Sequence, residues 1–196
     1  MSENKIKYGL KNVYYAIATI GSNNSATYGT PVAFPGAVAL SMDAQGEQTK
    51  FFADNIPYWG GNSNAGYEGT LEVAKVIDSF KKDVLGYIKD GKDVYVENAN
   101  ADAVHFALIF QFEGDVKATR HVLYNCVATR PAASGNTKEE TITPETETLN
   151  ITATTIYNST LSTDIVKAEA TPDSNSTTYD GWFSNVYLPT APSTTT

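Results

Sequence analysis

Residues 104–129, VHFALIFQFEGDVKATRHVLYNCVAT, carry the clearest structural pattern in the sequence. Large apolar side chains recur at every second position from Phe106 to Phe112, and a period of two predicts a β-strand. The residues EGDV at 113–116 are typical of a turn, and residues 117–129 then predict a second strand that returns along the first. The intervening positions, among them Ala107 and Ile109, are apolar as well. We therefore expect an antiparallel hairpin that is covered on both faces, at the centre of a sheet.

Two further segments, 68–75 and 145–156, alternate with the same period but keep one polar face each. A strand of this kind buries one face and leaves the other in water. Together with the central hairpin, these segments predict an all-β protein with one short helix, folded as an antiparallel β-sandwich or barrel. The expected core includes Leu71, Val73, Phe106, Leu108, Phe110, Leu149 and Ile151.

The chain length of 196 residues fits a single domain, 1–196, with arms at both ends. The helix is expected at residues 78–86, where Asp78 would be the N-cap and Gly86 the stop signal. An N-terminal arm covers about residues 1–12. A C-terminal arm covers about residues 171–196: a Ser/Thr/Asn linker, an aromatic patch with one helical turn capped by Asp180, and a Pro/Thr tail.

Residues 53–66 predict an extended loop with an aromatic cluster of its own. Glycine and asparagine are typical of a mobile loop, whereas Ile56, Tyr58 and Trp59 are not needed in a loop that faces water. Long loops of this kind are usually functional. Two interpretations remain open: the aromatic side chains fold back onto their own core, or they anchor a partner, as Trp and Tyr often do.

The composition restricts the classes of function. The chain has 22 acidic and 14 basic residues, a net charge of −8, which argues against a general affinity for nucleic acid. No apolar run is long enough for a transmembrane helix, and the first residues lack the apolar core of a signal peptide. The single cysteine, Cys126, excludes an internal disulfide. We expect a protein made in a reducing cytoplasm, without a membrane partner.

Catalytic patterns are absent, so we expect no enzyme, no metal site and no cofactor. With a two-residue turn at Gly114-Asp115, His121 would face Leu108 and His105 would face Tyr124, on opposite sides of the sheet. Cys126 would be a buried, inert thiol. The acidic residues Glu139, Glu140, Glu145 and Glu147 are interpreted as a solvated loop rather than a glycosidase pair.

Several stretches, taken in order, carry a family resemblance. They are YGLKNV at 8–13, PGAV at 35–38, FADN at 52–55, DVLG at 83–86, GDVKATRHVLYNC at 114–126, TRP at 129–131, TPETETL at 143–149 and YDGWF at 179–183. The most specific of them is the block at 114–126. Together they span nearly the whole chain, and the sequence resembles the major tail proteins of long-tailed, non-contractile phages of Gram-positive bacteria.

The resemblance implies a structural virion protein with the β-sandwich of phage tail tubes. Such subunits form rings, hexameric in related proteins, that stack into a hollow tube for DNA ejection. The implied partners are further copies of the chain and the tape measure, terminator and distal tail proteins, and DNA would pass through without specific binding. The expected location is the tail tube of the virion, after assembly in the host cytoplasm.

Two sets of residues follow from this interpretation. The expected contacts between subunits and rings are Asp54, Asn55, Ile56, Tyr58, Trp59, Trp182, Phe183 and Tyr187. The expected lining of the lumen is Glu68, Thr70, Glu72, Thr148, Asn150, Thr152 and Thr154. The alternative function is a carbohydrate- or surface-binding β-sandwich module in which Tyr58, Trp59 and Tyr67 stack on sugar.

Overall fold

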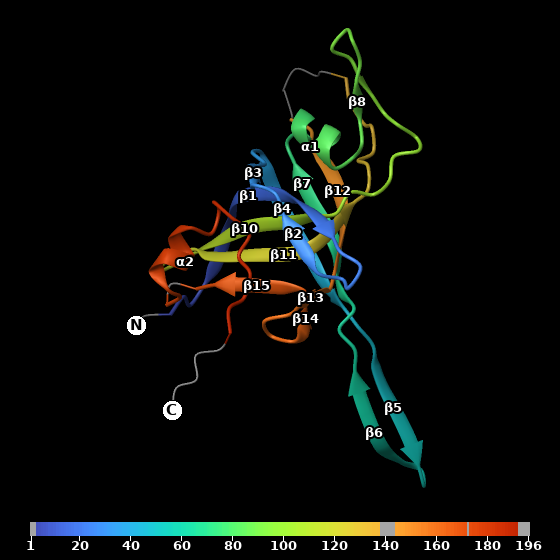
Figure 1. Ribbon diagram of the computed structural model, residues 1–196, viewed down its shortest axis with the longest axis vertical. Helices are drawn as coiled ribbons and strands as arrows, with labels where there is room; N and C mark the ends of the chain where they lie inside the picture. Colours follow the sequence, from blue (N-terminus) through green and yellow to red (C-terminus); the bar gives the residue numbers. More distant parts are fainter. Residues whose placement is uncertain (1–2, 138–143, 172, 192–196) are drawn as a thin grey trace.

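The central hairpin predicted from residues 104–129 lies in the middle of the computed structural model, which describes residues 3–137, 144–171 and 173–191 (Figure 1). It consists of β10 (Phe106–Gly114) and β11 (Thr119–Ala128), whose middle residues are buried on both faces. The other elements are β1 (Lys7–Ile20), β2 (Ala26–Tyr28), β3 (Val32–Ala33), β4 (Ala37–Gln45), β5 (Gln48–Ala53), β6 (Ile56–Asn62), β7 (Gly66–Val73), α1 (Asp78–Asp83), β8 (Ile88–Lys89), β9 (Tyr95–Val96), β12 (Glu147–Thr154), β13 (Ile156–Asn158), β14 (Thr163–Ile165), β15 (Lys167–Ala170) and α2 (Ser176–Asp180). The all-β fold class is confirmed, although the described chain has two short helices rather than one.

The main sheet folds over on itself to make a sandwich. Its strand order is β2-β1-β10-β11-β12-β7-β4. On the side of β11 away from β10, the first half of the strand pairs with β15 and the second half pairs with β12. Leu123 pairs with Lys167 on β15, whereas Cys126 pairs with Ala153 on β12. Beyond this division, the β12-β7-β4 part turns to face the β1-β10-β11 part across the main core. All seven core residues expected from the sequence are buried in that core.

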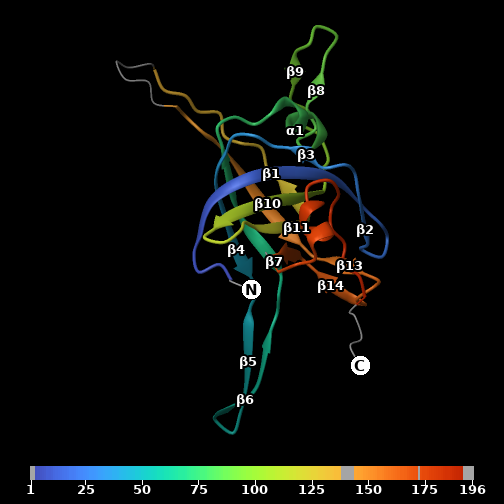
Figure 2. The ribbon, with the colours of Figure 1, turned by 90° about the vertical axis from the view of Figure 1, so that its left-hand side faces the viewer.

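A second core covers the other face of the central hairpin (Figure 2). Ile109 and Tyr124, on the outer face of β10 and β11, pack with Tyr179 and Trp182 of the C-terminal segment. The Tyr179 hydroxyl also donates a hydrogen bond to the Ala118 carbonyl at 2.5 Å. This second layer explains why both faces of the central hairpin are apolar in the sequence.

The register of the central hairpin differs from the prediction by two residues. His121 pairs with Phe110, not with Leu108, because β10 and β11 are joined by residues 115–118 rather than by a two-residue turn. A shift of two residues keeps every side chain on its face of the sheet, whereas a shift of one would reverse all of them. The expected faces are therefore retained from Thr119 to Leu123 although the expected pairs are wrong. A bulge between the Phe106 and Leu108 pairs then adds a shift of one residue, which places Cys126 beside Phe106 in the main core, on the face opposite to the one that the predicted register gives it.

Three boundaries also require correction. Helix α1 begins at Asp78 itself after the extended Ile77, and no side chain caps it, while Gly86 does follow the helix with a positive φ of 70°. The expected linker at 171–178 contains most of α2, which is capped by the side chain of Asn175, so Asp180 ends this helix instead of starting it. The second half of the expected N-terminal arm, from Lys7, is the beginning of β1 and pairs with β10. The expected positions 138–143, with Glu139 and Glu140, lie outside the described residues.

Candidate functional site

The segment expected as a loop at 53–66 is instead part of a projecting β-hairpin (Figures 1 and 2). Within the described residues, strands β5 and β6 pair only with each other, and they extend away from the sandwich. Asp54 and Asn55 form the turn, with φ values of 52° and 61°. Two consecutive positive φ angles are typical of the two-residue type I′ turn, whose twist matches that of the flanking strands, and Asn and Asp tolerate this conformation. The turn is therefore encoded locally.

This hairpin exposes large apolar side chains. Tyr58 is 72% exposed, and Phe51, Phe52, Ile56 and Trp59 are each close to 60% exposed. The Trp59 ring lies across Gly61, where a Cβ atom would approach the ring to 2.4 Å. An isolated two-stranded hairpin is marginally stable in water, and exposed aromatic patches commonly mark protein interfaces. The hairpin thus has the chemistry of a contact surface and no core of its own.

A polar face covers the outside of β7 and β12, opposite the main core. The register places Thr148 opposite Glu72 and Asn150 opposite Thr70. The seven residues expected at a lumen lie along this face: Glu68, Thr70, Glu72, Thr148, Asn150, Thr152 and Thr154. The structure brings them together because the two strands pair directly and in phase.

Strand β4 extends the same face. Ser41 pairs with Thr70 and Asp43 pairs with Glu68, and both β4 side chains are exposed. The sequence interpretation left these two residues out of the site, although the alternation of Val38 to Asp43 was a sufficient signal. The three strands contain no Lys or Arg, so Asp43, Glu68 and Glu72 give this face an acidic character. We call the exposed face of β4, β7 and β12 the acidic face.

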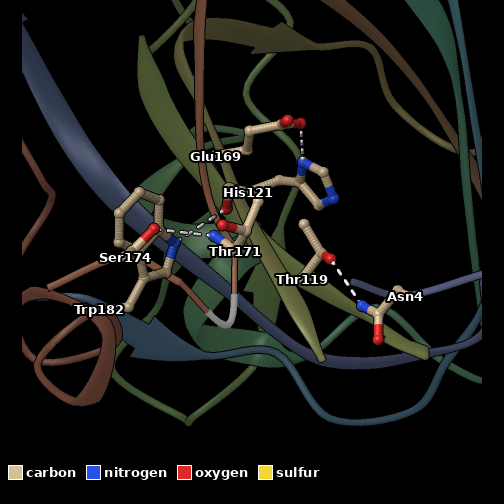
Figure 3. A network of polar contacts seen from close by, with 7 residues as sticks. All are labelled: Asn4, Thr119, His121, Glu169, Thr171, Ser174 and Trp182. Carbon is tan, nitrogen blue, oxygen red and sulfur yellow. Dashed lines mark hydrogen bonds and ion pairs between the residues drawn. The ribbon is translucent and has the colours of Figure 1, made fainter. Parts of the chain in front are cut away.

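In the C-terminal aromatic patch, one of the three expected contact residues is fully buried and the other two are partly accessible. Trp182 is 2% exposed and donates its indole N–H to the His121 carbonyl at 3.3 Å (Figure 3). The ring is already covered within its own chain, so its expected role as a contact between subunits stays a prediction that this burial does not favour. Phe183 and Tyr187 are half-buried, against Tyr14 and Trp182 respectively. These two rings keep an accessible edge.

The N-terminal residues before β1 are attached to their own chain. The Asn4 side chain donates to the Lys117 carbonyl at 2.7 Å and accepts from the Val116 N–H at 3.0 Å. The Lys5 N–H donates to Asp115 at 2.8 Å. This segment thus fastens the turn between β10 and β11, so it is not a free arm from Asn4 onward.

The thiol of Cys126 and the two imidazoles, which are the side chains with catalytic potential, are buried or engaged with other side chains. Burial raises the pKa of the Cys126 thiol to about 12, because the charged form is desolvated. His105 Nδ1 lies 2.6 Å from Asn125 Oδ1, whereas His121 stacks on Phe110, so the two imidazoles have separate partners. Among the residues that the structure describes, no His, Cys, Asp and Glu side chains gather in a group that fits a metal ion. No helix in that part of the chain is long and apolar enough to cross a membrane.

Comparison with known proteins decides the family. The family model described as phage tail tube protein matches residues 2–157. The chain belongs to the phage tail tube protein family. The match contains the projecting hairpin, the acidic face and the central hairpin, and it ends before β14, β15 and α2. The resemblance drawn from the sequence is thereby confirmed.

Comparisons with solved structures and with curated proteins give no further information on function. One solved structure, a chain of the "anti-feeding prophage (AFP) baseplate, 6-fold symmetrised", covers 87% of this chain and 97% of its own, with a TM-score of 0.43 and 10% identity. No curated protein matches. Family membership makes this chain a structural protein of the virion tail, which assembles with itself and with other tail components.

Proposed function

We propose that the chain is the repeating subunit of the tail tube: its copies form rings, six to a ring, and the rings stack into a hollow channel for DNA ejection. The observation that carries this proposal is the acidic face. A wide, three-stranded polar face that is free of Lys and Arg lies directly behind the main core. Such a face suits the wall of a channel, which must touch water and DNA rather than a partner.

Electrostatics favours the transit of DNA along this face. Duplex DNA carries one negative charge per roughly 1.7 Å of its axis, and each cation that neutralises a phosphate adds affinity. A basic wall would hold the DNA at every ring. A wall with Asp43, Glu68 and Glu72 in every copy repels the DNA from all sides, and salt screens this repulsion beyond about 10 Å at 0.1 M. The channel then guides the DNA without binding it.

The contacts between copies are assigned to the accessible apolar side chains and to the polar turn of the projecting hairpin beside them. These are Asp54, Asn55, Ile56, Tyr58 and Trp59 of the projecting hairpin, together with the exposed edges of Phe183 and Tyr187. The other proposed partners are the tape measure, terminator and distal tail proteins, with assembly in the host cytoplasm.

The first test is the assembly state of the purified chain. Electron microscopy and native mass spectrometry should show rings or tubes, and a reconstruction should place Glu68, Thr70 and Thr152 on the lumen. A protein that stays monomeric at high concentration contradicts the proposal. A tube whose lumen is lined by another face contradicts the assignment of the acidic face.

The second test concerns charge. A phage that carries Glu68→Lys with Glu72→Lys should still make tails but should eject DNA more slowly, most clearly at low salt. The matched control is Asp164→Lys with Asp173→Lys, two exposed acids away from the acidic face. Unchanged ejection at low salt by the first variant, with its lysines shown on the lumen, contradicts the electrostatic argument.

The alternative function, sugar binding by stacked aromatic side chains, has one supporting feature, the exposed pair Tyr58 and Trp59. Tyr67, the third expected member, belongs to β7 and is half-buried against the main core, with Lys167 Nζ 5.6 Å from its ring centre. The three rings therefore do not form one platform.

A further inference from the structure

A pocket of 320 Å³ lies at the margin of the main core, between β4 and the ends of β10, β11 and β15. Its apolar side is formed by Leu40, Met42, Phe110, Phe112 and Leu123, and the rest of its lining is Lys7, Ser41, Tyr67, His121 and Lys167. Three of these side chains, Leu40, Met42 and Phe112, are only half-buried. We call this cavity the margin pocket.

His121 lines the margin pocket and has unused hydrogen-bonding groups. The residue is 9% exposed, and neither ring nitrogen makes a hydrogen bond within the described chain. Nδ1 lies 3.5 Å from a Glu169 oxygen, an ion-pair distance rather than a hydrogen bond (Figure 3). Buried polar groups nearly always have partners, and each exception needs an explanation. A hydrogen bond from His121 to a group of another molecule would explain this exception.

Two ammonium groups border the same pocket. Lys7 Nζ lies 4.6 Å from the centre of the Phe112 ring, and Lys167 Nζ lies 5.6 Å from that of Tyr67. No carboxylate of the described residues lies within 4.0 Å of either nitrogen. Although Glu169 lies near the imidazole, the two lysines have no ion-pair partner within the described chain. A pocket that combines apolar side chains with two such cations suits an apolar group that carries an acid.

The turn of the projecting hairpin has this chemistry. Asp54 lies at the turn beside Ile56, which is 58% exposed. The carboxylate and the exposed apolar side chain are held in one geometry by the two-residue turn. No ion pair involves Asp54 within the described chain.

We propose that the margin pocket receives the hairpin turn of a second copy of the chain. Ile56 of the second copy enters between Leu40, Met42 and Phe112, and its Asp54 carboxylate lies between Lys7 and Lys167. His121 supplies a hydrogen bond to a polar group of the turn. This inference rests on the proposed tube and adds the surface on which the projecting hairpin docks.

The occupant is a second copy because the turn of the same chain is out of reach. From Met42 on the pocket wall to Asp54 at the turn, the extended chain spans about 40 Å at roughly 3.3 Å per residue, and the hairpin points away from the sandwich (Figure 1). A turn and a pocket at different places on one molecule form a heterologous contact, which repeats from copy to copy and builds a closed ring or an open filament. Each contact would then displace one copy from the next by about 40 Å along the hairpin.

Charge exchange tests the contact. Asp54→Lys, or Lys7→Glu with Lys167→Glu, should raise the protein concentration needed for tube formation by about tenfold or more, because a desolvated charge would lose its partner or meet a like charge. The three substitutions combined should restore assembly. The matched controls are Asp164→Lys and Lys82→Glu, both at exposed positions, and neither should change assembly. Circular dichroism melting checks that each variant folds.

Crosslinking locates the contact directly. Ile56→Cys combined with Met42→Cys should give a ladder of disulfide-linked multimers on a non-reducing gel after mild oxidation of assembled tubes, and Ile56→Cys with Val94→Cys should not. The native Cys126 is buried and is inert in this assay.

The outcomes separate this inference from the proposed function. Tubes that form normally with Asp54→Lys or the lysine variants, or a ladder with Val94→Cys in place of Met42→Cys, overturn the docking of the turn and leave the tube intact. A wild-type chain that never forms rings or tubes overturns the proposed function itself.

Discussion

The buried His121 gives the folded chain a defined acid sensitivity. Burial lowers the pKa of this imidazole from 6.5 to about 4; Glu169 opposes the shift, and Lys167 and Lys7 reinforce it. Between these two pH values the unfolded chain binds a proton that the folded chain does not, so the free energy of unfolding rises with pH. A shift of this size corresponds to about 3 kcal/mol, at 1.36 kcal/mol per pKa unit. This contribution is fully present above pH 6.5 and is lost as the pH falls to about 4.

The measurement is urea unfolding of the unassembled chain at several pH values from 3.5 to 8, in the wild type and in His121→Gln. The variant cannot take up the proton, so its stability relative to the wild type should improve by about 3 kcal/mol between pH 7 and pH 4. Subtracting the two proteins cancels the titration of the carboxylates, which both share. His105→Gln is the matched control, since it removes the other imidazole. If the difference between the wild type and His121→Gln stays constant with pH, the folded imidazole takes up protons as readily as the unfolded one, and the reasoning is refuted.

Three further predictions concern stability and local order. Leu108→Ala should destabilise the chain by roughly 2–5 kcal/mol in chemical unfolding, because Leu108 is fully buried, whereas Thr152→Ala on the acidic face should change it by about 0.5 kcal/mol or less. Trp182→Ala should cost roughly 3–5 kcal/mol and expose the C-terminal segment to protease, whereas Trp59→Ala should leave the melting of the unassembled chain almost unchanged and impair tube formation. Hydrogen exchange of the backbone amides in β5 and β6 should be fast in the unassembled chain and slow in tubes, while β10 and β11 should be protected in both; protection of β5 and β6 in the monomer would contradict their role as an assembly surface.

The fold class could be predicted because the strongest signals were local. Alternation in the central hairpin, β7 and β12 is set by side-chain polarity within each strand, and burial follows from it directly. The pairing of His121 could not be predicted, since the register depends on the length of the connection at 115–118. The strand β6 was missed because Pro57, Gly60 and Gly61 break its pattern, and pairing with β5 outweighs those residues. Helix α2 was missed because its sequence, STTYD, has low helix propensity and is fixed by packing of Tyr179.

In the candidate site, too, the features set within single strands could be predicted, whereas those that depend on the folded sheet could not. The seven polar residues of β7 and β12 were predicted to share one face, and they do, because two strands in phase place their polar sides together; their place on a lumen stays a prediction. The margin pocket had no signal in the sequence. Its lining comes from β1, β4, β7, β10, β11 and β15, so only the folded sheet brings Lys7, His121 and Lys167 together.

The two hairpins of this chain illustrate how one strand pattern separates stability from assembly. In β10 and β11, apolar side chains on both faces find partners within the chain, from the main core on one side and the C-terminal segment on the other. In β5 and β6, side chains of similar size contact only their own hairpin, pack into no core of the described chain and remain exposed. Fixing each residue of such a hairpin costs roughly 1–2 kcal/mol of backbone entropy, which its own cross-strand contacts, at about 0.2–1 kcal/mol each, do not fully offset. The remaining stabilising free energy must come from contacts with another molecule. The main core therefore determines whether the chain folds, and the projecting hairpin determines whether folded chains associate, so that substitutions in the two regions should affect different measurements.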